Sequence, residues 1–272
     1  MHFIHSSSTY EEHVHTTCVQ PPISLPGSPA QTRCVGTVLS RRKRCGKVGR
    51  SRQTALLVGL DGTLVASVYQ HVLAWRIVLE AEGIDLSVRG IHRIGLSGGL
   101  FINDLLRETE GGITPEQIDR VRFAHVTACN DLAAGTPPAS RQGAAHPDDG
   151  RRCAVGHCHQ RPLKTAGHVI ASLEIPDGVP VITRDRVAHA KPDPDLFEAA
   201  AERLGGNVEL AIVVGDSVWD LLAARRARAL GVGLHSGGYS ADELPSAGSY
   251  RVDKDSADHL LHLDEIGVRR AV

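Results

Sequence analysis

The chain has 272 residues, a length that suits one large domain or a core with a smaller inserted domain. Hydrophobic residues make up 42% of the sequence and charged residues 22%, close to the globular average. The formal net charge of −1 argues against nucleic acid or an anionic membrane as the main partner. The sequence holds no run of about 18 apolar residues, so we expect no membrane-spanning helix.

Two features predict a cytoplasmic protein with reduced thiols. The first residues of the chain lack the apolar stretch of a secretory signal. The cysteines also lack the spacing of a disulfide framework in a chain of this length. There are six of them: Cys18, Cys34, Cys45, Cys129, Cys153 and Cys158.

Residues 1–53 differ in composition from the rest of the chain. They are rich in Ser, Thr, Pro, His and basic residues, and no helical or strand period persists in them. We interpret this stretch as a disordered tail, or as an extension from a start codon placed too far upstream. A functional basic patch at residues 41–44 is an alternative that no fold motif supports.

A regular pattern of elements begins at Thr54. The apolar run 55–60 predicts a buried strand, and residues 67–82 predict an amphipathic helix that Gly83 closes. Further helices are expected at residues 99–108 and 114–131, the second with a proline in its first turn. These segments predict a mostly helical insert after the first strand.

The second half of the sequence alternates between strands and helices. Strands are predicted at residues 179–183, 210–214 and 231–234, and helices at 193–204 and 219–230. Such alternation predicts an α/β fold, with a parallel sheet that carries helices on both faces.

Three polar clusters follow predicted strands, at residues 61–63, 191–195 and 215–220. Open parallel sheets bind their ligands at these positions. Carboxylate oxygens suit Mg²⁺, and a lysine ammonium neutralises phosphate charge. Taken singly, each cluster could be a helix cap or a turn. Together they predict a site for Mg²⁺ and a phosphoryl group.

These clusters resemble the motifs of haloacid dehalogenase (HAD) superfamily phosphohydrolases, above all the beta-phosphoglucomutase and phosphoglycolate-phosphatase group. The family's D-x-D-G-T motif aligns with residues 59–63, its K-P-x-P-D motif with residues 191–195, and its G-D-S-x-x-D motif with residues 215–220. The resemblance runs from about residue 54 to residue 261. It implies Mg²⁺-dependent hydrolysis of a phosphate monoester on a small phosphorylated metabolite, such as a phosphosugar.

The resemblance also implies a domain arrangement. A Rossmann-like parallel sheet, the HAD core, would comprise residues 54–69 and 136–265, and a helical cap domain would span residues 70–135. Within the cap, residues 91–99 resemble the substrate-facing loop, which makes Arg93 and Ser97 candidates for substrate binding.

Individual roles in the core follow from the same resemblance. Asp61 would be the general acid/base and would also reach the metal through its backbone carbonyl. Lys191 would link the nucleophile and the phosphate electrostatically. Asp216 would ligate Mg²⁺ with support from Asp220, and Thr63 would contact the substrate.

The chain departs from the family pattern at position 59. The family's nucleophile is the first carboxylate of the first motif, and here that position is Gly59. Glycine can neither attack phosphorus nor ligate Mg²⁺, so the covalent route is lost. Asp61 belongs to the leaving-group side and is no substitute. Ala66 is a second departure, at a position where relatives usually carry an aspartate.

The family's second motif is a Ser or Thr at the end of a strand, and residues 136–162 show no apolar strand with that ending. One interpretation is a slip of the reading frame, because codons for residues 156–162, read one base later, can encode A-T-A-T-S-G. Residues 136–161 would then be foreign to the fold, and a central strand would be absent or badly replaced. A second interpretation is a zinc cluster on Cys153, His157, Cys158 and His159, although their spacing matches no zinc signature.

Two functions therefore compete. The first is a HAD-type phosphatase that is disabled or severely impaired. The second is a non-catalytic pseudo-enzyme that binds a phosphorylated ligand. The sequence predicts no nucleic-acid or membrane partner and makes no prediction of oligomeric state.

Overall fold

The computed structural model describes residues 54–95, 101–110, 112–134 and 153–269. The predictions for residues 1–53 and for residues 136–152 lie outside these ranges. None of the described helices is long and apolar enough to cross a membrane.

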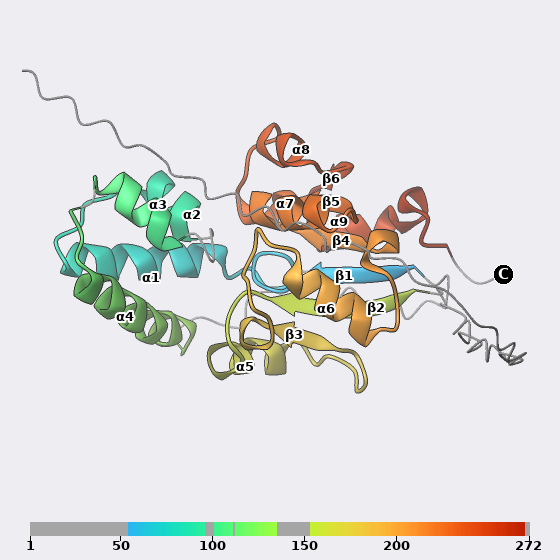
Figure 1. Ribbon diagram of the computed structural model, residues 1–272, viewed down its shortest axis with the longest axis horizontal. Coiled ribbons are helices and arrows are strands. Elements are labelled where there is room, and N and C mark those ends of the chain that lie inside the picture. Colours follow the sequence, from blue (N-terminus) through green and yellow to red (C-terminus); the bar gives the residue numbers. More distant parts are fainter. Residues whose placement is uncertain (1–53, 96–100, 111, 135–152, 270–272) are drawn as a thin grey trace, which may run out of the picture. The chain divides into compact units, whose positions relative to one another are not determined.

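Six parallel strands form one sheet in the order β3-β2-β1-β4-β5-β6 (Figure 1). Their bounds are β1 Ala55–Gly59, β2 Ala154–His159, β3 Val181–Thr183, β4 Ile212–Gly215, β5 Leu230–Leu234 and β6 Arg251–Asp253. The chain moves outward from β1 to β3 and then returns to β4 on the other side of β1. The strand order thus reverses between β1 and β4, which is where such sheets form a ligand-binding crevice. The predicted α/β fold is confirmed.

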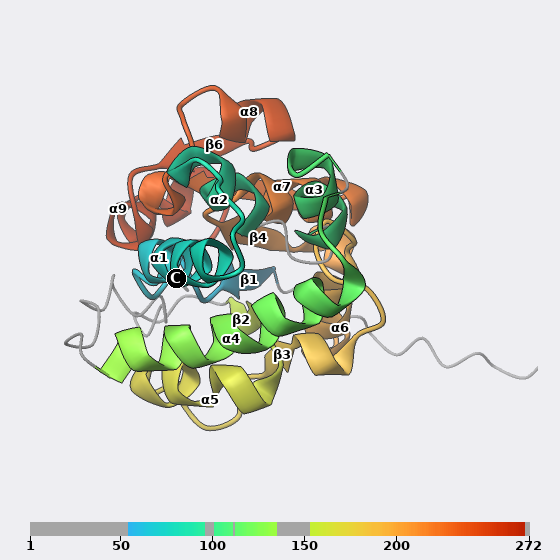
Figure 2. The same ribbon diagram turned by 90° about the vertical axis from the view of Figure 1, so that its left-hand side faces the viewer.

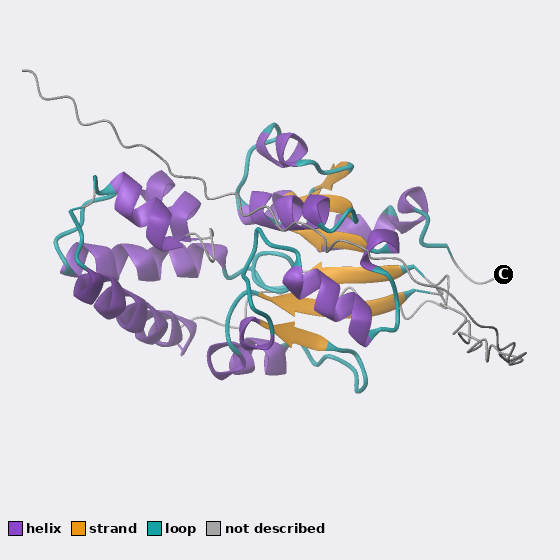
Figure 3. Ribbon diagram, in the orientation of Figure 1, coloured by secondary structure: helices purple, strands orange, loops and turns teal. Residues whose placement is uncertain are grey.

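Helices cover both faces of this sheet (Figure 3). The helices and 3₁₀ turns of the core are α5 Leu163–Ser172, α6 Asp195–Arg203, α7 Val218–Arg226, α8 Glu243–Ala247, α9 Ser256–Leu261, and the turns Arg184–Arg186, Val208–Leu210, His235–Gly237 and Leu263–Ile266. The α6 helix crosses in front of β1 and β2 in the view of Figure 1. The predicted helices 193–204 and 219–230 correspond to α6 and α7, with ends shifted by a few residues.

Alternation along β1 divides the core into two layers. Leu56 and Val58 pack in one buried cluster with Leu263, whereas Leu57 packs on the opposite face with Phe197 of α6. All five residues of β1 are buried. Successive side chains of a strand point to opposite faces, so a strand covered on both sides needs apolar residues throughout.

Four helices stand between β1 and β2: α1 Val68–Ala81, α2 Val88–Gly95, α3 Phe101–Glu108 and α4 Pro115–Ala134. They share a buried cluster of their own, which includes Leu79, Leu105 and Val121. The α1 and α4 helices lie side by side (Figures 1 and 2). The predicted helical insert is therefore present. The interpretation of residues 91–99 as a loop is wrong for residues 91–95, which end α2.

A central strand was expected to be absent or badly replaced, and the first of these alternatives is wrong. Residues 154–159 form β2, paired in register with β1 on one side and β3 on the other. His157, Cys158 and His159 are buried in it. Polar residues in a fully buried strand hide the apolar pattern that identifies strands in a sequence. The reading-frame hypothesis for residues 136–161 stays a prediction, which sequencing of the locus would test.

Candidate active site

A cavity of about 490 Å³ is lined by residues that follow β1, β2 and β4, and by residues of α1 and α4. The three predicted clusters meet here, because the carboxyl ends of parallel strands share one edge of the sheet. Its charged and polar lining residues are Asp61, His71, Arg122, His125, His159, Gln160, Arg161, Thr165, Lys191, Asp216, Ser217 and Asp220.

Lys191 and Asp220 form a buried ion pair, with Lys191 Nζ 2.5 Å from Asp220 Oδ1. The other carboxylate oxygen of Asp220 accepts a hydrogen bond from Ser217 Oγ, in a capping box that begins α7. Burial alone would lower the pKa of Lys191, but the charge of Asp220 and its hydrogen bond raise it. Lys191 is therefore a charged lysine held at the cavity wall by α7.

Asp216 follows β4 directly, lines the cavity, and accepts a hydrogen bond from Thr63. Thr63 Oγ1 donates a hydrogen bond of 2.9 Å to Asp216 Oδ1, and both residues are buried. Thr63 is absent from the described cavity lining, so its observed contact is with Asp216. The sequence predicts that Thr63 contacts the substrate, and that role stays a prediction beside its hydrogen bond to Asp216.

The carboxylates of Asp216 and Asp220 suit a hard divalent cation. Burial, followed by the charge of Asp220, raises the pKa of Asp216 to about 7. A bound divalent cation would offset the repulsion between the two groups, and carboxylate oxygens are the ligands that Mg²⁺ takes in proteins. The two residues therefore fit Mg²⁺, although Gly59 supplies no third carboxylate.

Asp61 is surrounded by basic side chains and a hydroxyl. Arg161 donates two hydrogen bonds to Asp61, from Nε to Oδ2 at 3.1 Å and from Nη2 to Oδ1 at 3.2 Å. Ser67 Oγ donates a third, at 2.6 Å, and the imidazoles of His71 and His159 lie 3.7 and 3.6 Å from Oδ2. Burial would raise the pKa of Asp61, but the charges of His159 and Arg161 outweigh it and hold that pKa well below its usual value.

The two histidines beside Asp61 titrate in opposite directions. Burial would lower the pKa of His71, but hydrogen bonds to Asp61 and Cys129 raise it to about 9. Burial lowers the pKa of His159 to about 4 against the pull of Asp61. Near neutral pH the site therefore contains a charged His71 and a neutral His159.

Position 59 lies at the carboxyl end of β1, opposite Cys158 of β2. A β-carbon at Gly59 would lie 2.8 Å from Thr63 Oγ1 and 3.6 Å from the carbonyl oxygen of Val214. The first distance is shorter than a β-carbon tolerates, so any side chain here requires Thr63 to move. The obstacle is the Thr63 side chain, because the nearest backbone atom is at an ordinary contact distance.

The haloacid dehalogenase-like hydrolase family matches residues 54–228, which hold all three motifs and the β1–β4 crevice. The chain belongs to the haloacid dehalogenase-like hydrolase family. Among its relatives, phosphoglycolate phosphatase of Rhodospirillum rubrum is 28% identical over 75% of this chain and 88% of that protein. Fructose-1-phosphate phosphatase YqaB of Escherichia coli is 26% identical over 65% of this chain and 93% of that protein.

Solved structures agree with this family. The crystal structure of a hydrolase from Pseudomonas syringae has 42% sequence identity and a TM-score of 0.72, and it matches 79% of this HAD-like hydrolase and 99% of that chain. A beta-phosphoglucomutase structure from Bacteroides vulgatus has a TM-score of 0.65 at 19% identity, covering 80% of this chain and 90% of that one. At 19% identity, the similarity to the Bacteroides vulgatus structure supports the fold alone.

Of the two specificity candidates of this HAD-like hydrolase, Arg93 does not line this cavity. Arg93 is exposed on α2 and lines a second, smaller cavity of about 320 Å³ with Trp219 and Tyr239. Ser97 lies outside the described residues. A substrate role for either residue stays a prediction.

The zinc cluster on the β2 segment is contradicted by strand geometry. Cys158 and His159 are neighbours in β2, so their side chains point to opposite faces of the sheet. Cys158 Sγ contacts the carbonyl oxygen of Leu196, whereas the His159 ring faces Asp61. These residues cannot share one tetrahedral metal.

Sequence reasoning missed Arg161 and His71. Arg161 follows β2 by two residues, which is the strand-end signal used for the other clusters, but β2 itself went unidentified. His71 is one turn into α1 and gives no motif. The contact between His71 and Asp61 depends on how α1 is oriented relative to the loop after β1, and the sequence does not give that orientation.

Proposed function

We propose that this chain is a phosphatase-type protein of the cytoplasm whose site receives a small phosphorylated metabolite, such as a phosphosugar, but hydrolyses it poorly or not at all. The observation that carries the proposal is Gly59. It stands where the family resemblance expects the nucleophilic carboxylate, and a side chain added there would meet the hydroxyl of Thr63. The helices α1–α4 would act as the cap over this site.

The remaining parts of a phosphoryl site are in place. Lys191 would neutralise phosphate charge from its buried position against Asp220. Asp216 and Asp220 would hold Mg²⁺, with Asp61 contributing its backbone carbonyl. Bound Mg²⁺ would supply a positive charge for the phosphoryl oxygens. These residues would bind and orient a phosphate ester even though they cannot form an aspartyl-phosphate.

Besides the missing carboxylate at Gly59, the contact of Arg161 with Asp61 would lower the catalytic activity of the site. A general acid must carry its proton at the working pH, so its pKa has to lie near that pH. The charges of His159 and Arg161 hold the pKa of Asp61 well below its usual value, and the pair with Arg161 thereby helps to keep Asp61 ionised. Asp61 would therefore protonate a leaving oxygen poorly, and restoring the nucleophile alone would recover only part of the activity.

A screen of phosphate monoesters with Mg²⁺ tests this proposal in four forms of the chain: unmodified, Gly59→Asp, Gly59→Asp with Arg161→Gly, and Gly59→Asp with Asp216→Asn. We expect no turnover above background from the unmodified chain. Turnover should appear with Gly59→Asp, rise when Arg161 is also replaced, and vanish with Asp216→Asn. Cooperative thermal unfolding of each variant checks that it is folded. Robust, chelator-sensitive turnover by the unmodified chain would refute the account of position 59.

A second function is supported by the cations at the cavity. Arg161 and Lys191 both line it, and His71 beside them is charged near neutral pH. Such a site could retain a phosphorylated ligand without chemistry. Calorimetric titration of the unmodified chain with phosphoglycolate distinguishes the two functions. Binding that Lys191→Met abolishes, without turnover, supports the non-catalytic binder, and undetectable binding supports a disabled phosphatase.

A further inference from the structure

We propose that His71, His125 and Cys129 form a zinc site between α1 and α4, with its fourth coordination position open to the cavity. The proposal concerns the helical insertion and does not depend on the phosphatase-type function argued above. It also differs in residues and in place from the β2 segment that the sequence suggested.

The three ligand atoms converge on one point. Cys129 Sγ lies 3.2 Å from His71 Nδ1 and 3.2 Å from His125 Nε2, and all three atoms lie within 4.8 Å of one another. Zn–S bonds of about 2.3 Å and Zn–N bonds of about 2.0–2.1 Å place tetrahedral ligand atoms roughly 3.4–3.6 Å apart. The two distances from Cys129 Sγ are within a few tenths of an ångström of these values, and the two histidine nitrogens, within 4.8 Å of each other, would close on the ion.

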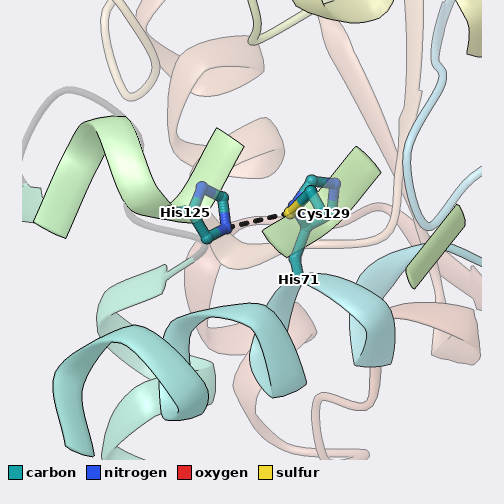
Figure 4. A group of neighbouring side chains, drawn as sticks. All are labelled: His71, His125 and Cys129. Carbon is teal, nitrogen blue, oxygen red and sulfur yellow. Dashed lines mark hydrogen bonds between the residues drawn. The ribbon is translucent and has the colours of Figure 1, made fainter. Parts of the chain in front are cut away.

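The scaffold holds these side chains in place. His125 and Cys129 are four residues apart on α4, so they share one face of the helix, and His71 meets them from α1 (Figure 4). The His125 ring stacks on Trp75 with 3.6 Å between ring centroids and 10° between planes. All three ligand residues are at least nine-tenths buried. Little side-chain freedom remains to be lost when a metal binds.

His71 has a carboxylate beside its second ring nitrogen. Its Nδ1 faces Cys129, and its Nε2 lies 3.7 Å from Asp61 Oδ2, longer than a hydrogen bond. Histidine ligands typically donate their second ring nitrogen to a carboxylate, so a small approach of the two groups would give His71 that outer partner.

The donor set of the cluster also suits zinc. Binding would release to solvent the proton of the Cys129 thiol and any proton on His71 Nδ1. The set of one thiolate and two imidazoles matches the ligand preference of Zn²⁺.

The cavity supplies access to the fourth position. His71 and His125 line it, so a water molecule could complete the tetrahedron from that side. Three protein ligands and one open position are the arrangement of reactive zinc sites rather than of closed structural ones.

The test is a Zn²⁺ titration of the full-length, chelator-stripped chain in competition with a chromogenic chelator. Residues 1–53 contain further histidines and cysteines, so the site is identified by its variants and not by stoichiometry alone. We expect Cys129→Ser and His125→Gln each to weaken the tightest site by at least about 100-fold, more than loss of an outer partner costs. Cys153→Ser, a cysteine outside the cluster, should leave that affinity unchanged. Asp61→Asn should weaken it by about 10–100-fold.

Cobalt substitution gives an independent readout. A thiolate-to-Co²⁺ charge-transfer band should appear in the unmodified chain and in Cys153→Ser, and disappear in Cys129→Ser. Thermal unfolding in chelator establishes that each variant is folded, and two separate ligand variants keep the test decisive if one of them fails to fold. The proposal is overturned if the unmodified chain shows no such band, or if Cys129→Ser and His125→Gln bind Zn²⁺ as tightly as the unmodified chain does.

Discussion

Gly59 shows how one missing side chain affects its surroundings. With no β-carbon at this position, Thr63 approaches the β1 backbone and donates to Asp216 across the cavity floor. Thr63 is completely buried there. Gly59 carries no carboxylate and packs against Thr63, which joins the first motif to the third, so a side chain introduced here has a structural cost.

We expect Gly59→Ala to lower the free energy of unfolding by about 1–3 kcal/mol, the cost of overpacking a well-filled core. Gly167→Ala is the matched control, because Gly167 is exposed in α5 and a β-carbon there meets nothing within 4 Å. The same substitution at Gly167 should raise the free energy of unfolding by about 0.5–1 kcal/mol, since alanine favours a helix interior. Urea unfolding at constant pH measures both changes, and equal effects at the two sites would contradict this account.

At the scale of elements, β6 and α9 are joined by a buried ionic cluster. Asp253 accepts hydrogen bonds from Arg251 Nε and from His259 Nδ1, each at 2.7 Å. His259 is almost completely buried. Burial lowers the pKa of His259, against the opposing effect of Asp253, while the charges of Arg251 and His262 lower it further.

This shift gives a prediction for pH. A histidine whose pKa is lower in the folded state binds its proton more readily when unfolded, so stability falls as the pH falls below about 6.5. We expect the free energy of unfolding to decrease less between about pH 7.5 and 5.5 in His259→Gln than in the unmodified chain. Urea titrations at both pH values measure the two slopes. Parallel slopes would show that His259 does not contribute to the acid sensitivity.

Two other elements show how far prediction from sequence reaches. The β1 and β4 strands were predictable because buried parallel strands are apolar along their whole length. The β2 strand was not, because His157 and His159 break that pattern. They are buried in the strand only because β1 and β3 pair with it on both sides.

At the scale of the whole molecule, the sheet and the helices described here lie between residues 54 and 269. We expect a chain without residues 1–50 to keep its thermal midpoint within about 4 °C, which corresponds to roughly 1 kcal/mol for a domain of this size. Thermal unfolding of both chains under the same conditions checks this. A larger drop would mean that residues 1–50 stabilise the fold.

The sequence by itself determined the three motifs, the parallel sheet that brings them together, and that position 59 carries no carboxylate. These features are local, because each depends on a short run of residues and on the strand that precedes it. Only the tertiary structure decided that Arg161 pairs with Asp61, 100 positions away, and that Cys129 meets His71 across two helices. Buried polar groups need hydrogen-bond partners, and the tertiary packing decides which group each of them meets. The spacing of residues along the chain does not predict such pairs.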